Sequence, residues 1–246
     1  MAENSKIYNK YKETLKPNEN EMNELPYEKA LNTDKRTYCQ FYYSLLKTQH
    51  LLLFAFYPMK DYNLRLIKID LFFINFAMNY AVNALFFNDD TMHQIYEDGG
   101  DFNIIYQIPQ IIYSSLISGI LFSILKLFAI TENNVLEIKH EKETKDLKIK
   151  EEKAYSALNI KFILFVVTSF IMLSGFFYYL ACFSAIYKNT QIHLIKDTLI
   201  SFALSMVYPF ISFLLPGIFR IPSLSDKNNK RELLYKFSKF LQMLLG

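Results

Sequence analysis

The chain has 246 residues, of which 52% are hydrophobic and 21% charged, and its formal net charge is +3. Two cysteines exclude a disulfide-rich scaffold, and six glycines form no glycine-rich phosphate-binding loop. The average composition hides a segregated pattern, because four long stretches contain no Lys, Arg, Asp or Glu: residues 71–87, 102–125, 162–187 and 198–219. A transmembrane helix needs about 20 mostly apolar residues. We therefore predict an all-α integral membrane protein with four transmembrane helices.

The segment before the first span divides in two. Residues 1–33 are polar and predict a flexible cytosolic N-terminus. In residues 34–63, Phe41, Leu45 and Leu52 recur at helical spacing, and Pro58 ends the pattern. Because the apolar part is too short to cross a bilayer, it predicts an amphipathic helix at the cytosolic interface, followed by a turn.

The transmembrane domain is expected over residues 64–220. Its spans are predicted at about 64–87, 102–126, 161–187 and 197–219. The linker 127–160 carries charges of alternating sign, which predicts a solvated cytosolic helix that continues the spans. Proline kinks are expected in the second and fourth spans, and Pro216 with Gly217 is expected to end the fourth helix early.

The charges of the loops predict the orientation. Residues 88–103 carry acidic side chains and no Lys or Arg, whereas residues 126–161 carry eight lysines. The short loop 188–197 has two lysines, and the tail after the fourth span is again basic. Because basic residues stay on the cytosolic side, both termini are expected in the cytosol.

The tail, residues 221–246, combines a polar break with a basic amphipathic helix. Such a helix beside a membrane is typical of binding to anionic lipid. The candidate lipid-binding residues are Lys230, Arg231, Lys236 and Lys239.

The most informative polar side chains lie inside the spans. Asn75, Asn79 and Asn83 are spaced i, i+4 and i+8, so they share one face of the first span. In the second span Ser115, Gly119 and Ser123 form a stripe of small residues that lets helices approach closely. An amide in hydrocarbon needs a partner, so these residues serve either helix packing or the polar lining of an ion path. No ionisable residue is expected in the middle of a span, which argues against proton-coupled transport.

Sites for chemistry are not expected. The four histidines are scattered, and no Ser, Cys or Lys lies in the setting of an activated nucleophile, so we predict no enzyme and no cofactor. The acidic loop is a weak candidate for a cation site, although a solvated loop is the favoured interpretation. Its acidic residues are Asp89, Asp90, Glu97, Asp98 and Asp101.

Several local patterns resemble the membrane region of polycystin-1-like proteins that follows their lipase-homology (PLAT) domain. They are KTQHLLL at 47–53, NALFF at 83–87, residues 109–126, and YKNTQ at 187–191 followed by DTLIS at 197–201. The stretch 34–225 is also similar to multi-pass proteins of single-celled eukaryotes. The resemblance implies a peripheral module of membrane helices, either an accessory subunit or a truncated gene product. No residue of that family's pore or extracellular domain has a counterpart here.

These observations favour a non-catalytic structural or accessory subunit of a larger membrane complex. The expected partners are the lipid bilayer and other membrane proteins, with no nucleic acid and no small-molecule substrate. Two alternatives remain: a small homo-oligomeric ion channel lined by the Asn face of the first span, and a module that binds anionic lipid.

Overall fold

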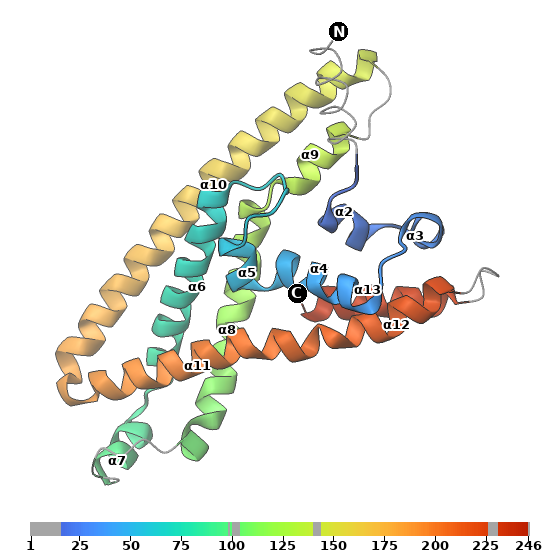
Figure 1. The fold of residues 1–246 in the computed structure, drawn as a ribbon. Helices are drawn as coiled ribbons and strands as arrows, with labels where there is room; N and C mark the ends of the chain where they lie inside the picture. Colours follow the sequence, from blue (N-terminus) through green and yellow to red (C-terminus); the bar gives the residue numbers. More distant parts are fainter. Residues whose placement is uncertain (1–15, 98, 100–103, 140–143, 226–230, 246) are drawn as a thin grey trace. The chain divides into compact units, whose positions relative to one another are not determined.

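The computed structural model describes residues 16–97, 99, 104–139, 144–225 and 231–245 (Figure 1). Over these residues the protein is helical and contains no β-strand. The chain forms two compact units: a bundle unit, Asn63–Met206, and a terminal unit that joins Met1–Tyr62 to Val207–Gly246. The helices are α2 Glu19–Glu24, α3 Tyr27–Thr33, α4 Tyr38–Gln49, α5 Leu51–Phe56, α6 Arg65–Leu85, α7 Asp89–Glu97, α8 Ile104–Ala129, α9 Glu132–Lys139, α10 Thr144–Ile186, α11 Gln191–Ser212, α12 Leu214–Ser225 and α13 Glu232–Leu245.

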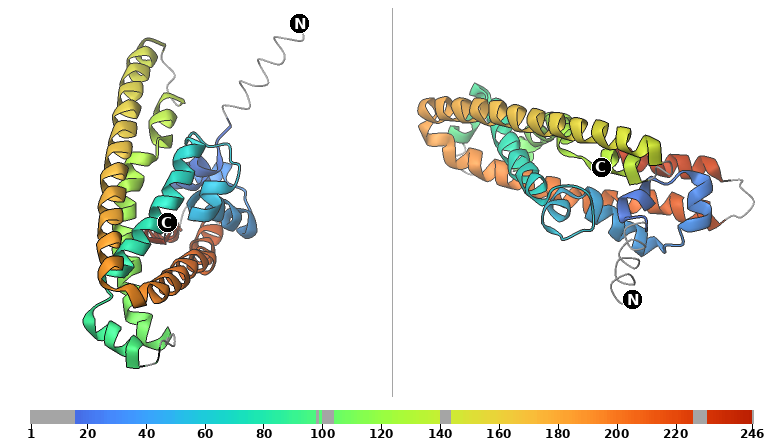
Figure 2. Two further views of the ribbon diagram at one scale, coloured as in Figure 1. Left: turned by 90° about the vertical axis from the view of Figure 1, so that its left-hand side faces the viewer. Right: turned by 90° about the horizontal axis from the view of Figure 1, so that it is seen from above.

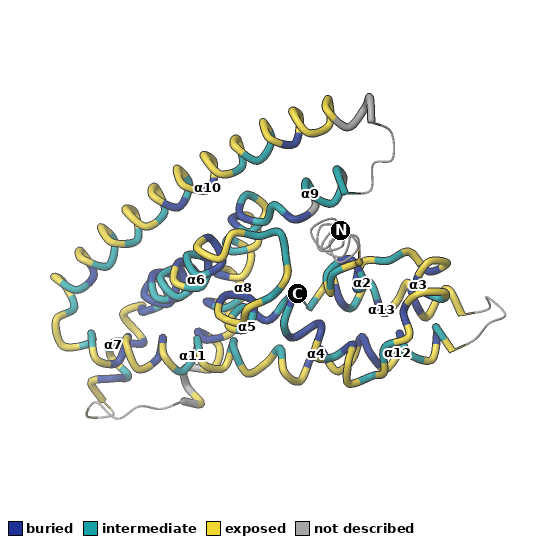
Figure 3. The backbone as a smooth tube through the Cα atoms, turned by 45° about the horizontal axis from the view of Figure 1, so that its top comes forward, coloured by how far each residue is buried: buried dark blue, intermediate teal, exposed yellow. Residues whose placement is uncertain are grey.

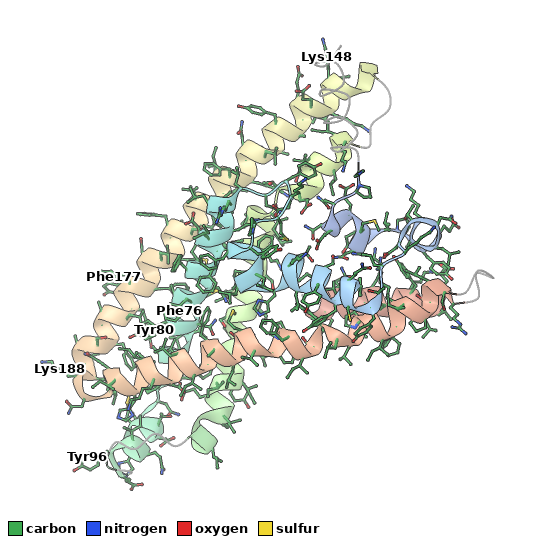
Figure 4. All side chains as sticks on the ribbon, in the orientation of Figure 1. Phe76, Tyr80, Tyr96, Lys148, Phe177 and Lys188 are labelled. Atoms are coloured by element: carbon green, nitrogen blue, oxygen red, sulfur yellow. The ribbon has the colours of Figure 1, made fainter. Side chains whose placement is uncertain are left out.

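The bundle unit is built around α6, which lies beside α8 and α10 (Figures 1 and 2). About half of α6 is buried, and Leu71, Ile74, Met78 and Val82 recur every three or four residues along its inner face. The outer faces of α8 and α10 carry many exposed apolar side chains. Figure 3 shows the exposed positions of α10 in yellow along its length. Phe177 projects outward from α10 and is 77% exposed (Figure 4).

Within the described residues, three stretches are long and apolar enough to cross a membrane: Ile108–Leu136, Lys148–Ile186 and Lys188–Ser225. The helix α6 meets the same criteria only together with α7, from which it is separated by a bend of 84°. The apolar exposure of α8 and α10 has a physical reason, because a helix that is apolar all round cannot be solvated by water on its outer face.

The fourth long helix begins earlier than predicted. The turn after α10 needs only Tyr187 and the short 3-10 helix Lys188–Thr190, so α11 begins at Gln191 and not at residue 197. The side chain of Gln191 donates a 2.8 Å hydrogen bond to the carbonyl of Ser184, which ties the turn to the end of α10. Asp197 therefore lies inside α11. No ionisable residue was expected in the middle of a span, and Asp197 lies near the start of α11, within the long apolar stretch Lys188–Ser225.

Pro216 and Gly217 do not end the fourth helix. The break lies at Phe213, after which α12 continues to Ser225. Pro216 is in the first turn of α12, where its missing N–H has no helical partner to lose. Gly217 serves a contact, because a Cβ atom there would lie 2.7 Å from the ring of Tyr38 in α4.

The described part of the charged linker is helical except at Ile130 and Thr131, with α9 near its start and α10 running without interruption from Thr144 to Ile186. Residues 140–143 lie outside the described part. The join between α8 and α9 is held by Lys161, whose Nζ donates to the carbonyl of Ile130 at 3.2 Å and to Asn134 Oδ1 at 2.8 Å. Helix α10 is thereby fixed against this join.

The terminal unit contains two short helices where one amphipathic helix was predicted over residues 34–56. Helix α4 begins at a capping box formed by Thr37 and Gln40, and it ends at His50, where α5 starts. Phe41, Leu45 and Leu46 of α4 pack against Phe213 in one apolar cluster. Tyr27 of α3, Ala30 and Tyr235 of α13 form a second. The core of this unit therefore joins the two ends of the chain.

A candidate polar site in the helical bundle

The three asparagines of the first predicted span lie inside the bundle unit. Asn75, Asn79 and Asn83 are all buried, as their spacing on one face of α6 predicts. They do not form a continuous ladder with one another. The Nδ2 of Asn79 donates to the carbonyl of Asn75 at 3.2 Å, and its Oδ1 accepts from the hydroxyl of Ser118 in α8 at 3.2 Å. Asn83 bonds to different partners.

Asn83 belongs to a cluster of four buried polar side chains from three helices. Its Nδ2 donates to Asp197 Oδ2 at 2.6 Å and to Thr198 Oγ1 at 3.1 Å, both on α11. Gln110 of α8 completes the cluster, since its Nε2 donates to Asn83 Oδ1 and to Asp197 Oδ2, each at 3.1 Å. We call Asn83, Gln110, Asp197 and Thr198 the amide–carboxylate cluster. It links α6, α8 and α11 where an apolar core would otherwise be expected.

The carboxylate at its centre is incompletely satisfied. Asp197 is 0% exposed, and two amide groups donate to its Oδ2, whereas its Oδ1 has no hydrogen-bond partner among the described residues. A buried polar atom without a partner costs about 1–3 kcal/mol, and more when the group is charged. Such atoms are rare in folded proteins, so this one marks a place that the packing alone does not explain.

The same face of α11 carries two more unpartnered atoms. His193 and Ser201 lie one helical turn before and after Asp197, and both are buried. Within the part of the chain that the structure describes, neither His193 Nδ1 nor Ser201 Oγ has a hydrogen-bond partner. Across the bundle, Ser169 Oγ of α10 is also buried without one. The inward face of α11 thus offers three polar side chains in line, with Asp197 in the middle.

An aromatic layer limits the cluster on one side. Phe202 of α11 packs edge-on against Phe72 and Phe76 of α6, with ring centroids 5.6 and 5.1 Å apart (Figure 4 labels Phe76). At the other side, Leu194 packs with Ala84, Phe87 and Phe183. Polar contacts between α6 and α11 are therefore confined to a short length of the bundle.

The stripe of small residues in α8 lies on the face that points away from the rest of the bundle unit. Ser115 is partly exposed, Gly119 and Ser123 are exposed, and a Cβ atom at Gly119 would meet nothing within 4 Å. Both serine hydroxyls donate to carbonyls of their own helix. The neighbouring Ser114 and Ser118 are the serines buried in the bundle, because a shift of one residue turns a helical position by about 100°.

The acidic loop is partly helical. Asp89 and Asp90 lie in the first turn of α7, where carboxylates interact favourably with the helix dipole, and His93 pairs with Glu97 at 3.1 Å on the surface. Asp98 and Asp101 lie outside the described residues. Among the residues that the structure describes, no group of three or more His, Cys, Asp or Glu side chains is placed to hold a metal ion.

The basic residues of the tail take different roles. Lys239 pairs with Glu24 of α2 at 3.2 Å, Lys236 pairs with Glu232 one turn away at 2.8 Å, and Arg231 donates to the carbonyl of Pro222 at 3.2 Å. Lys230 lies outside the described residues. Helix α13 packs through polar positions, because its buried residues are Tyr235, Ser238 and Gln242. Its exposed apolar side chains include Leu233, Phe237, Phe240, Met243 and Leu244.

Asp197 and Gln110 are the site residues that the sequence-based prediction missed. The charges of residues 188–197 were counted as those of a loop and the fourth span was predicted from about residue 197, so Asp197 was taken as a boundary residue and not as part of a buried helical face. The available signal was the spacing of His193, Asp197 and Ser201, which places three polar side chains on one helical face next to an uncharged stretch.

Comparison with protein-family models, curated protein sequences and solved structures gives no match. The resemblance to polycystin-1-like proteins therefore stays a prediction from the sequence motifs.

Proposed function

We propose that the chain is a multi-pass membrane protein in which α6, α8, α10 and α11 are four transmembrane helices. The long apolar stretches and the exposed apolar faces of α8 and α10 support this, since lipid is the solvent that such faces require. α6 meets the criteria for a membrane span only together with α7, and about half of its residues are buried. The distribution of lysines supports a cytosolic location for both termini.

Within the membrane, its role is that of a non-catalytic structural or accessory subunit. The observation that carries this proposal is the set of hydrogen bonds that the asparagines of α6 make. Asn79 and Asn83 bond to α8 and α11 of the same protomer, which favours packing over the lining of a pore between protomers. The outward surface of α8 then remains for neighbouring membrane proteins, with the stripe at Ser115, Gly119 and Ser123 as the place of closest approach for another helix.

The alternative of a homo-oligomeric channel has weaker support. A pore lined by the Asn face would need that face to turn toward a symmetry axis, away from the partners it has in the bundle. The aromatic layer of Phe72, Phe76 and Phe202 also places apolar rings next to the polar cluster. Desolvating an ion against such a layer is costly.

Lipid binding by the tail is a second candidate function. It is supported by the exposed apolar residues of α13 beside the exposed Lys236. Replacing Leu233 and Leu244 with Asp in the full chain, which leaves the buried face of α13 intact, is expected to reduce binding to vesicles containing phosphatidylserine. Unchanged binding contradicts this function.

The accessory role is tested by purifying the protein from its native membrane in mild detergent and measuring the mass and composition of the particle. Co-purification of other membrane proteins at fixed stoichiometry supports the proposal. A homogeneous homo-oligomer that conducts ions after reconstitution, with a conductance altered by replacing the three asparagines with Leu, contradicts it and favours the channel.

A further inference from the structure

We infer that Asp197 binds one small monovalent cation of the Na⁺ class inside the bundle, at its unpartnered Oδ1. This goes beyond the proposed function, because the argument depends only on the burial of Asp197 among α6, α8 and α11. Binding and the accessory role can therefore fail independently of each other.

The buried carboxylate of Asp197 has no positively charged side chain beside it among the described residues. Asp197 is completely buried, and within the described residues its hydrogen bonds come from the amide groups of Asn83 and Gln110, with no Lys or Arg among them. The adjacent Lys196 is exposed on another face of α11. A buried carboxylate without a counter-ion is strongly unfavourable in a low-dielectric setting, so it either binds a proton or holds a cation.

The hydrogen bonds favour a cation over a proton. Two N–H donors, from Asn83 and Gln110, converge on Oδ2 at 2.6 and 3.1 Å, and donors of this kind stabilise the ionised carboxylate. A proton on Oδ1 would satisfy one atom only. A cation accepts several lone pairs together, and Ser201 Oγ offers a second unpartnered oxygen one helical turn away. Side chains spaced i and i+4 have Cβ atoms about 5–6 Å apart, close enough for two oxygens to share an ion.

The side chains around Asp197 favour a cation with a single positive charge. The amide–carboxylate cluster contains one carboxylate, its other side chains are neutral amides and a hydroxyl, and the neighbouring Ser201 adds a second neutral hydroxyl. Divalent ions such as Ca²⁺ are held by six to eight oxygens, normally with more than one carboxylate. One positive charge balances Asp197, and oxygen ligands suit a hard alkali cation.

The position in the helix indicates the side of entry. Asp197 is the seventh residue of α11, so it lies about 9 Å from the helix start by the α-helical rise. His193 lies between it and that end, with a buried and unpartnered Nδ1. On the opposite side, Phe202 packs against Phe72 and Phe76. The cation therefore enters from the α10–α11 turn and binds without passing through the bundle.

The test measures binding of ²²Na⁺ to the purified full chain in detergent, with choline chloride keeping the ionic strength constant. We expect saturable binding of one ion per chain, and thermal stability that rises with Na⁺ but not with choline. Asp197→Asn keeps the size and the amides of the cluster and is expected to abolish binding while remaining folded. Ser201→Ala is expected to weaken binding about tenfold, the effect of losing roughly 1.4 kcal/mol.

Asp90→Asn serves as the matched control, because Asp90 is an exposed acid of the same unit. It is expected to bind Na⁺ as the wild type does. Three outcomes overturn the inference: no saturable binding of Na⁺ or K⁺, equal binding by the wild type and Asp197→Asn, or an infrared carboxylic-acid band that is lost in Asp197→Asn and insensitive to Na⁺. The last result would make Asp197 a proton site.

Discussion

Arg220 and Asp34 are 186 residues apart in the chain and form a buried ion pair, with Arg220 Nη2 2.9 Å from Asp34 Oδ2. The guanidinium of Arg220 is 0% exposed and also donates to the carbonyls of Met22 and Asn23. The rings of Phe41 and Tyr235 lie 4.7 and 4.8 Å from its Cζ atom. One side chain of α12 thus binds α2, α4, α13 and the loop before α4 into the terminal unit.

Removing one partner of this pair should destabilise the terminal unit severely. Arg220→Met leaves Asp34 buried with only Arg36 as a counter-charge, and breaking a buried pair costs about 3–5 kcal/mol. The measurement is the free energy of unfolding of the full chain, followed by hydrogen exchange in α4. Lys236→Met removes an exposed pair with Glu232 and is expected to change that free energy by less than about 1 kcal/mol. Equal effects of the two substitutions would show that Arg220 does not stabilise the terminal unit more than an exposed ion pair does.

The same carboxyl group makes the terminal unit sensitive to acid. Burial by itself raises the pKa of Asp34, but the hydrogen bonds and charges of Arg36 and Arg220 outweigh it and hold the pKa below its ordinary value of 3.8. A lowered folded-state pKa contributes stability above the unfolded-state value, and this contribution is lost as the pH falls through the folded-state value. We expect the stability difference between wild type and Asp34→Asn to be constant above about pH 5 and to shrink below pH 4. A difference that does not change with acid pH would contradict this assignment.

How far the sequence predicts this protein depends on the element. The apolar stretches gave the helical class, because twenty uncharged residues leave few alternatives to a buried or lipid-facing helix. The spacing of Asn75, Asn79 and Asn83 placed them on one face, and the structure buries that face. Which partners they find was not predictable, since hydrogen bonds to Gln110 and Asp197 depend on how three helices are arranged in space.

The errors of the prediction have a common physical origin. A charge count treats Lys196 and Asp197 alike as loop residues, although they lie on different faces of α11 and only Asp197 is buried. Similarly, Pro216 signals a helix end in a linear reading, yet proline is tolerated in the first turn of α12. Both errors concern helix boundaries. The boundary at Gln191, for example, is stabilised by the hydrogen bond from Gln191 to the carbonyl of Ser184, and a hydropathy or charge pattern does not reveal such a bond.

Loss of Asn83 should destabilise the bundle unit. Asn83→Leu removes the shortest hydrogen bond to Asp197 and leaves Gln110 with one acceptor fewer, and bonds to charged groups are worth about 1.5–3 kcal/mol. The measurement is the midpoint of thermal unfolding in detergent. Ser123→Ala is the matched control, because Ser123 is exposed and bonds only to its own helix, and its effect is expected within about 0.5 kcal/mol. Similar midpoints for both variants would show that the amide–carboxylate cluster does not stabilise the bundle.

The close contact between α4 and α12 gives a prediction with an internal control. A Cβ atom at Gly217 would lie 2.7 Å from the Tyr38 ring, whose hydroxyl donates to the carbonyl of Leu214 at 2.8 Å. Gly217→Ala must therefore displace the ring and break that bond, at a cost of about 1–3 kcal/mol. At Gly175, inside α10, an added Cβ meets nothing within 4 Å, so Gly175→Ala is expected to stabilise its helix by about 0.5–1 kcal/mol. Opposite signs in the measured free energies of unfolding support the packing of Tyr38 on Gly217.

In the double variant with Tyr38→Ala, the cost of Gly217→Ala should largely disappear, since the clashing ring is gone. A full cost in that background would place the strain elsewhere.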